Sequence, residues 1–242
     1  MSDWLVAGCA LFAAGLAQGL AGFGSGLVAV SLLPLVWPVS FAVGVSAVYS
    51  LFIAGILAWQ LRAHLRAREI LVPVVAAICA VPLGAAGLRA VDPALALGCL
   101  GAVITAYAAW SLLRTERETS AMPRLWGVAA GLTSGMLTGA FNTGGPPIVA
   151  WVGAQTWSKD EMKGTLQIFF IPSSLVAIAT YVRSGVVDAE TLGWNLRLAP
   201  ALLGGLWIGA MLYGRVPQKA FRTLLHVGLL LVGAHYLVSA VG

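Results

Sequence analysis

The sequence predicts an all-α fold: a polytopic membrane helical bundle built from two inverted repeats. Each repeat is expected to hold a glycine-rich broken or re-entrant hairpin followed by three transmembrane helices. Of the 242 residues, 60% are hydrophobic and only 10% are charged, and the mean hydropathy is +0.91. A soluble domain carries about 25% charged residues. Apolar runs long enough to cross a bilayer recur along the chain, and none alternates as a membrane β-strand does.

The apolar pieces predict the helices in order. They lie at 4–20, 24–37, 41–61, 69–88 and 94–113 in the first half, and at 125–140, 146–156, 161–182, 195–213 and 219–240 in the second. Both halves show the same order: one piece, a glycine-rich break, a shorter piece and three longer pieces. The most polar stretch separates the halves. We therefore predict a first transmembrane repeat at 1–113, a cytoplasmic connector at 114–124 and a second repeat at 125–242.

The two glycine-rich breaks align with each other when two residues are inserted into the second. The matched glycines are Gly15 with Gly131, Gly19 with Gly135 and Gly26 with Gly144. Lipid offers no water to backbone polar groups, so irregular chain at membrane depth must be buried in protein or line a cavity. Two breaks at matching positions are the pattern that points to the binding site of a transporter.

The distribution of basic residues predicts the orientation, because Lys and Arg favour short cytoplasmic loops. If each broken pair returns to the face that it entered, the 14 basic residues divide eleven to three between the faces. The minority face then holds Arg89, Arg183 and Arg197. If each broken pair is one crossing, the division is eight to six. The first arrangement is favoured; it gives the halves opposite orientations and puts both termini in the periplasm.

The breaks also supply the candidate binding groups. Glycine lets backbone N–H groups approach a ligand closely, and the N-terminus of the next helix adds partial positive charge. An anion is expected between the two breaks. The predicted substrate-binding residues are Gly24, Ser25 and Gly26 at the first break, Asn142, Thr143, Gly144 and Gly145 at the second, and Gln18 and Gln167 on nearby helices. The alternatives are that the glycines serve close helix packing and that Gln167 makes an interhelical hydrogen bond.

The sequence lacks the residues and motifs that several kinds of chemistry require. The predicted spanning cores contain no Asp or Glu, so a carboxylate proton relay or sodium site is disfavoured. No nucleotide-binding or hydrolase motif occurs, so we expect no enzyme, no catalytic residue, no metal and no cofactor. The basic residues are spread over short loops, which indicates topology rather than nucleic-acid binding. Cys9, Cys79 and Cys99 lie in apolar segments and are expected to be small core residues.

At the breaks the chain resembles the TauE/SafE sulfite exporter family, also called the toluene sulfonate uptake permeases. The resemblance rests on the run Gly22–Leu27, the following Leu33-Pro34-Leu35, and the stretch from Gly139 to Pro147. It extends to the length, the two-half layout and the charged connector. Ser25 and the pair Asn142-Thr143 depart from the fuller glycine run of the family. The resemblance implies transport of sulfite, organosulfonates or related small anions in a bacterial inner membrane.

These observations predict a secondary transporter that exports a small sulfur-containing anion by alternating access around the paired half-helix N-termini. Export is favoured because an inside-negative potential drives an anion out by about 2.3 kcal/mol per charge per 100 mV. The rival hypotheses are an anion channel and a membrane subunit that transports nothing. The expected partners are the anion and the lipid bilayer, and the many small residues are compatible with a homodimer.

Overall fold

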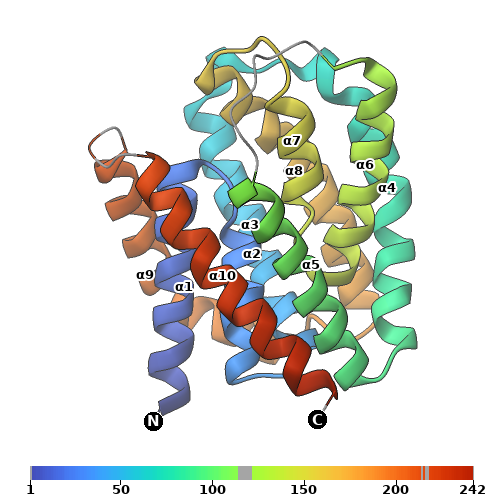
Figure 1. Ribbon diagram of the computed structural model, residues 1–242, viewed down its shortest axis with the longest axis vertical. Coiled ribbons are helices and arrows are strands. Elements are labelled where there is room, and N and C mark those ends of the chain that lie inside the picture. Colours follow the sequence, from blue (N-terminus) through green and yellow to red (C-terminus); the bar gives the residue numbers. More distant parts are fainter. Residues whose placement is uncertain (1, 114–121, 214, 216–217, 242) are drawn as a thin grey trace. The chain divides into compact units, whose positions relative to one another are not determined.

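The fold is all helical in the part of the chain that the structure describes, which is the backbone of residues 2–113, 122–213, 215 and 218–241 of this computed structural model (Figure 1). The elements are α1 (Ser2–Ala21), α2 (Ser25–Leu32), η1 (Leu33–Leu35), α3 (Val39–Gln60), η2 (Arg62–His64), α4 (Ala67–Ala90), α5 (Pro93–Leu113), α6 (Arg124–Phe141), α7 (Gly145–Val152), α8 (Lys159–Arg183), α9 (Ala189–Leu212) and α10 (Gln218–Val241). Within those residues, six helices are long and apolar enough to cross a membrane: α1, α3, α4, α5, α8 and α9. The predicted all-α membrane bundle is confirmed. Most of the predicted connector, residues 114–121, lies outside the described residues.

The helices that follow the two breaks are short. Both α2 and α7 have 8 residues, which at 1.5 Å per residue is about 12 Å and well below the thickness of the hydrocarbon core. The 3-10 helix η1 extends α2, and both elements contact α1. The first short piece therefore folds back along the helix that precedes it, as the predicted hairpin requires. The inverted relation of the two repeats stays a prediction.

The chain divides into two compact units that interleave the sequence halves. Unit 1 comprises residues 1–42, 90–116 and 194–242, and unit 2 comprises residues 43–89 and 117–193. Unit 1 thus contains α1, α2, η1, α5, α10 and most of α9. Unit 2 contains α4, α6, α7, α8, η2 and most of α3. Each unit holds one of the two breaks.

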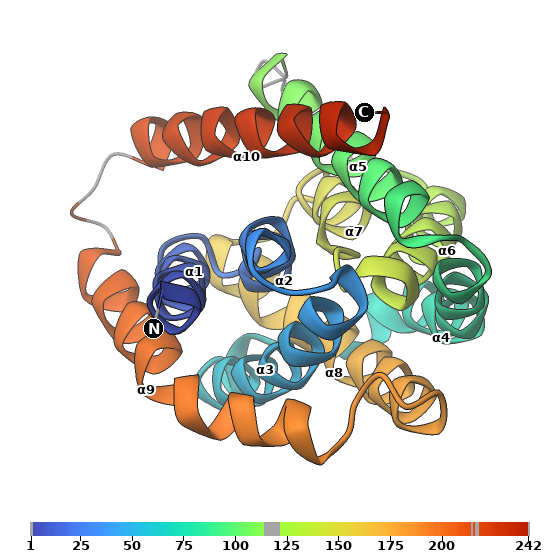
Figure 2. The ribbon, with the colours of Figure 1, turned by 90° about the horizontal axis from the view of Figure 1, so that it is seen from below.

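In unit 1, α1 lies beside α9 at glycine positions (Figure 2). A Cβ on Gly15 would collide with the carbonyl oxygen of Leu202, and one on Gly19 would lie 2.7 Å from the backbone nitrogen of Ala210. Real Cβ atoms do not approach backbone this closely, so only glycine permits the observed spacing. The helix before the first break is therefore fixed on a helix from the second half of the sequence.

Unit 2 repeats this packing with the roles of the halves exchanged. Its break-bearing helix α6 lies beside α4 of the first half (Figures 1 and 2). Three glycines of α6 each face one residue of α4 at backbone distance: Gly131 faces Pro73, Gly135 faces Ala77 and Gly139 faces Val81. In each half, the helix before the break thus packs through glycines on the third long helix of the other half. This recurrence agrees with the self-similarity of the sequence.

The short helix α7 is held in the apolar core of unit 2. Ile148 and Trp151 of α7 are 0% and 4% exposed, and they belong to a cluster with residues of α4, α6 and α8. Other members are Ile70, Val74, Ala77, Ala130, Val152, Leu166 and Phe169. Apolar contacts with α4, α6 and α8 therefore hold α7, and with it the second break, in place although α7 is short.

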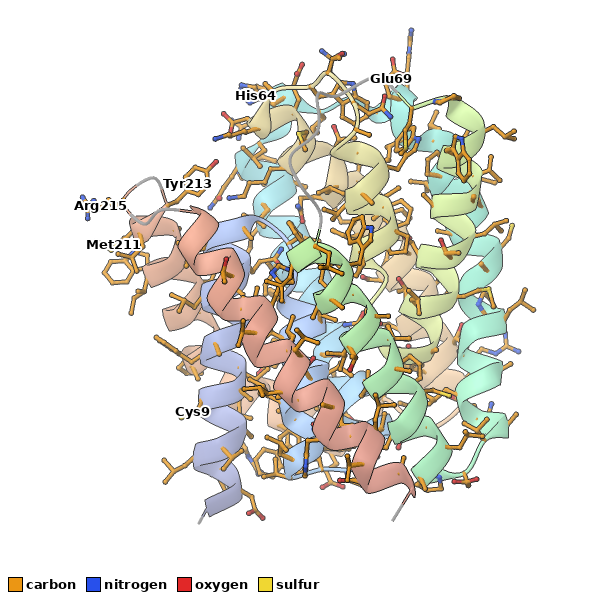
Figure 3. All side chains as sticks on the ribbon, in the orientation of Figure 1. Cys9, His64, Glu69, Met211, Tyr213 and Arg215 are labelled. Carbon is orange, nitrogen blue, oxygen red and sulfur yellow. The ribbon has the colours of Figure 1, made fainter. Side chains whose placement is uncertain are left out.

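Charged side chains of unit 2 gather near helix ends, whereas Arg197 of unit 1 lies inside α9, which begins earlier than the sequence predicts. His64 and Glu69 lie at one end of unit 2, where η2 leads into α4 (Figure 3). At the N-terminus of α8, the guanidinium of Arg66 binds the carboxylate of Glu161, with Nε to Oε1 at 2.9 Å. Ser158 and Glu161 also form a capping box at this helix start.

The expectation that the cysteines are core residues is wrong. Cys9, Cys79 and Cys99 are all exposed on the surface of the chain, and Figure 3 shows Cys9 on the outer side of α1. The outer surface of a membrane protein contacts lipid, so an apolar side chain gains nothing from facing inward. Apolar sequence context therefore does not distinguish core from surface in this chain.

Candidate anion site at the glycine-rich breaks

The first break is a tight turn stabilised by the side chain of Gln18. After α1 ends, Gly22 and Gly24 adopt left-handed φ values of 80° and 100°, which glycine tolerates without steric cost. The Gln18 amide donates from Nε2 to the Gly22 carbonyl at 3.3 Å, and its Oε1 accepts from the Ser25 N–H at 3.0 Å. Gln18 therefore bridges the two ends of the turn.

Two donors are left over at the start of α2. The N–H of Val28 bonds to the carbonyl of Gly24 at 2.9 Å and closes the first turn of the helix. Ser25 donates to Gln18, so the N–H groups of Gly26 and Leu27 are those for which helix geometry provides no acceptor inside α2. Ser25 and Gly26 are both buried. The predicted first-break residues thus surround a helix N-terminus, as expected.

The second break turns at an asparagine. Asn142 has φ 53°, the one positive φ among the described residues other than glycine, and asparagine is the residue that adopts this region most readily after glycine. Its Nδ2 donates to Ser46 Oγ at 3.1 Å and to Ser50 Oγ at 2.9 Å. Both N–H donors of this amide are therefore committed to α3, and Asn142 positions the turn.

Ser46 and Ser50 hold the Asn142 turn in place, and the sequence analysis did not predict this role. They lie four residues apart in α3, so they share one face of the helix. A pair of serines at this spacing within an apolar helix was the available signal. Their partner, however, is more than ninety positions away in the chain, and nothing in the local pattern identifies it.

The start of α7 offers few backbone donors. Pro146 and Pro147 have no N–H, and the Ile148 N–H donates to the hydroxyl of Ser134 at 3.0 Å. Gly145 carries the remaining N–H of the first turn. Ser134 aligns with Gln18 when the breaks are matched, because each immediately precedes a matched glycine. Both side chains cap the short helix that follows their break.

Thr143 carries a buried hydroxyl whose hydrogen-bonding capacity is unused among the described residues. Its side chain is 1% exposed, and Oγ1 has no hydrogen-bond partner in that part of the chain. Leaving such a group unsatisfied costs about 1–3 kcal/mol. A buried hydroxyl of this kind needs an explanation, and its position directly before Gly144 and Gly145 suggests a ligand.

The two glycines of the second break have different surroundings. A Cβ on Gly144 would collide with Thr138 Oγ1 and the Ser134 carbonyl, so Gly144 serves the close packing of the turn on α6. A Cβ on Gly145 would meet only Phe170 Cζ, at 4.0 Å. Gly145 therefore has space in front of it, beside its N–H and close in sequence to the Thr143 hydroxyl.

Tyr181 and Gln167 are buried polar side chains of α8 in unit 2. The Tyr181 hydroxyl contacts the carbonyls of Thr138 at 2.8 Å and Gly139 at 2.7 Å, which fixes the last turn of α6. Gln167 is fully buried, and its Nε2 donates to the Lys163 carbonyl at 2.8 Å within the same helix. That bond satisfies one donor of Gln167; its predicted role in binding stays a prediction.

Both breaks lie in stretches of sequence without charge. Residues 4–61 and 125–158 contain no Lys, Arg, His, Asp or Glu. Among the described residues, no cluster of His, Cys, Asp and Glu is suited to a metal ion. The second break therefore presents neutral donors, a hydroxyl and a backbone N–H, at a helix N-terminus. Such an arrangement can replace part of the hydration shell of an anion.

Comparison with protein families gives one match along nearly the whole chain. The model of the family described as sulfite exporter TauE/SafE matches residues 7–236, a range that includes both breaks. No curated protein and no solved structure shows a significant match to the chain.

Proposed function

Because the chain belongs to the TauE/SafE sulfite exporter family, a family of membrane transporters, we propose that it exports a small sulfur oxyanion bound at the second break. The observation that carries this proposal is the buried Thr143 hydroxyl without a partner among the described residues. Thr143 is two residues before Gly145, whose N–H is at the start of α7. A sulfite or sulfonate group offers oxygen acceptors to both donors.

The proposed transport is secondary and electrogenic, with alternating access to the site. Since residues 4–61 and 125–158 carry no charge, the anion itself is the charge that moves in the field. An inside-negative potential then drives export by about 2.3 kcal/mol per charge per 100 mV. We propose an inner-membrane location with both termini in the periplasm. Gly24, Ser25 and Gly26 of the first break remain proposed contributors, as do Gln18 and Gln167.

Flux measured in proteoliposomes tests the proposal. The purified chain is reconstituted, and the fluxes of sulfite, methanesulfonate and chloride are recorded under an imposed potential. The proposal expects saturable sulfite or sulfonate flux that reverses with the potential and is stimulated by substrate on the opposite side. Flux that neither saturates nor shows this stimulation would indicate a channel. The absence of flux from folded protein would indicate a subunit without transport activity.

A substitution at Gly145 tests where the anion binds. Outside its two chain neighbours, a Cβ on Gly145 meets only Phe170 Cζ, at 4.0 Å, so a valine side chain has space on that side and would cover the N–H. Valine before Pro146 disfavours helical backbone, so the melting temperature of Gly145→Val is measured alongside its flux. We expect the folded variant to lose at least about nine-tenths of the flux, a change of about 1.4 kcal/mol.

The matched control is Gly55→Val in α3, where a Cβ would have nothing within 4 Å. It should transport as the wild type does. Wild-type flux in Gly145→Val would remove the second break from the proposed binding site.

A further inference from the structure

The described side chains that contact the second break are uncharged. The side chains that contact it come from α3, α6 and α8: the hydroxyls of Ser46 and Ser50 on Asn142, those of Ser134 and Thr138, and the ring of Phe170. One titratable group is present among these described contacts. It is the Tyr181 phenol, which contacts two carbonyls of α6, and a phenol keeps its proton at neutral pH.

The nearest cation along α8 is at the far end of α7. A Cβ on Gly145 would lie 4.0 Å from Phe170 Cζ, whereas one on Gly153 would lie 3.8 Å from Met162 Cε. Helix α8 therefore runs antiparallel to α7. Lys163, next to Met162, is at the C-terminal end of α7, about 12 Å from the break by helix length. Arg66 is at this same end of α8, paired with Glu161.

Neutral hydrogen-bond donors bind singly charged anions more favourably than doubly charged ones. The free-energy cost of removing an ion from water rises with the square of its charge, whereas the attraction to a fixed set of dipoles rises only in proportion to the charge. A set of neutral donors of fixed strength therefore offsets a smaller share of this cost for a dianion than for a monoanion, and a nearby cation would be needed to reverse that preference. The second break offers a hydroxyl and a helix N-terminus instead.

We infer that the anion bound at Thr143 and Gly145 is a monoanion, either an organosulfonate or hydrogensulfite, and that the sulfite dianion is excluded. This inference rests on the proposed function and deepens it. Sulfite takes up a proton near neutral pH, whereas a sulfonate is singly charged throughout that range. Export of hydrogensulfite carries that proton with the anion, without any protonatable side chain at the break.

The test compares two substrates across neutral pH in proteoliposomes of the wild-type chain. The pH is equal on both sides, the potential is fixed, and the total concentration of sulfite or methanesulfonate is constant. We expect methanesulfonate flux to stay level. Above the ionisation of hydrogensulfite, sulfite flux should fall about tenfold per pH unit, because the monoanion fraction falls by that factor. Sulfite rates from all pH values should form one curve when plotted against hydrogensulfite concentration.

Vesicles containing Gly145→Val supply the background, including neutral sulfur dioxide that crosses the lipid at low pH. A sulfite flux that stays level or rises with pH, beside level methanesulfonate flux, would overturn the monoanion inference and leave the proposed function standing. The absence of protein-dependent flux for both substrates at every pH would overturn the proposed function, and the inference with it.

Discussion

The two breaks have the same framework and different chemistry. In each, a long helix ends, a residue with left-handed φ turns the chain, and a helix of 8 residues begins. A side chain at the matched position, Gln18 or Ser134, caps that short helix. At the first break both residues with left-handed φ are glycines, Gly22 and Gly24, and Gln18 bridges the two ends of the turn. At the second, Asn142 ties the turn to α3.

The two breaks differ in the hydrogen-bond donors that they leave for a ligand. The first break leaves backbone N–H groups at Gly26 and Leu27, whereas the prolines of the second remove two such donors. In their place the second break has the buried Thr143 hydroxyl, which lacks a partner among the described residues. The two breaks thus share their packing and capping, and the second adds the side chain that we propose binds the anion.

The largest expected effect concerns the shared framework. Gly19→Ala in α1 would bring a Cβ to 2.7 Å from the Ala210 nitrogen, and Gly135→Ala in α6 would bring one to 2.7 Å from the Ala77 Cα. Each should destabilise the protein by about 3 kcal/mol, because backbone cannot move aside as a side chain can. Thermal unfolding in detergent measures both.

The control for these variants is Gly8→Ala in α1, where a Cβ would have nothing within 4 Å, and it should leave the melting temperature nearly unchanged. If only one of the two framework variants lost much stability, the helices before the breaks would not be equivalent in their packing.

A smaller effect is expected from the caps. Gln18→Leu removes two hydrogen bonds within the first break, and Ser134→Ala removes the acceptor of the Ile148 N–H. We expect losses of about 2 and about 1 kcal/mol in the free energy of unfolding, respectively. Equilibrium unfolding checks this order. If Ser134→Ala proved the more damaging, the caps would not be equivalent in the way that the alignment indicates.

The sequence predicted the framework well because helix ends in this chain are marked locally. Glycine runs and prolines bound α2 and α7, and the two matched glycines, Gly19 and Gly135, each lie where their helix packs on the backbone of another. Gln18 was predicted as a binding residue, and the structure shows it bonded to Gly22 and Ser25. That contact spans only seven positions, so its capping role was within reach of sequence reasoning.

What escaped prediction depends on contacts between distant segments or on the lipid environment. The bonds from Asn142 to Ser46 and Ser50 join parts of the chain that no local pattern connects. The orientation of Cys9 could not be inferred, because both faces of α1 are apolar. That Thr143 is buried and lacks a partner among the described residues emerges only when α6 and α7 are packed together.

The most direct test of the account is Thr143→Val, which removes the hydroxyl and keeps the shape of the side chain. We expect sulfite or methanesulfonate flux to fall about tenfold or more, equivalent to about 1.4 kcal/mol. The melting temperature should be unchanged or higher, because an unsatisfied buried group is lost. Thr105→Val is the matched control: its Oγ1 is likewise buried without a described partner, on α5 against Gly233 of α10, and its flux should not change. Unchanged flux in Thr143→Val, or a parallel loss of flux and stability, would contradict the assignment of this hydroxyl to the anion.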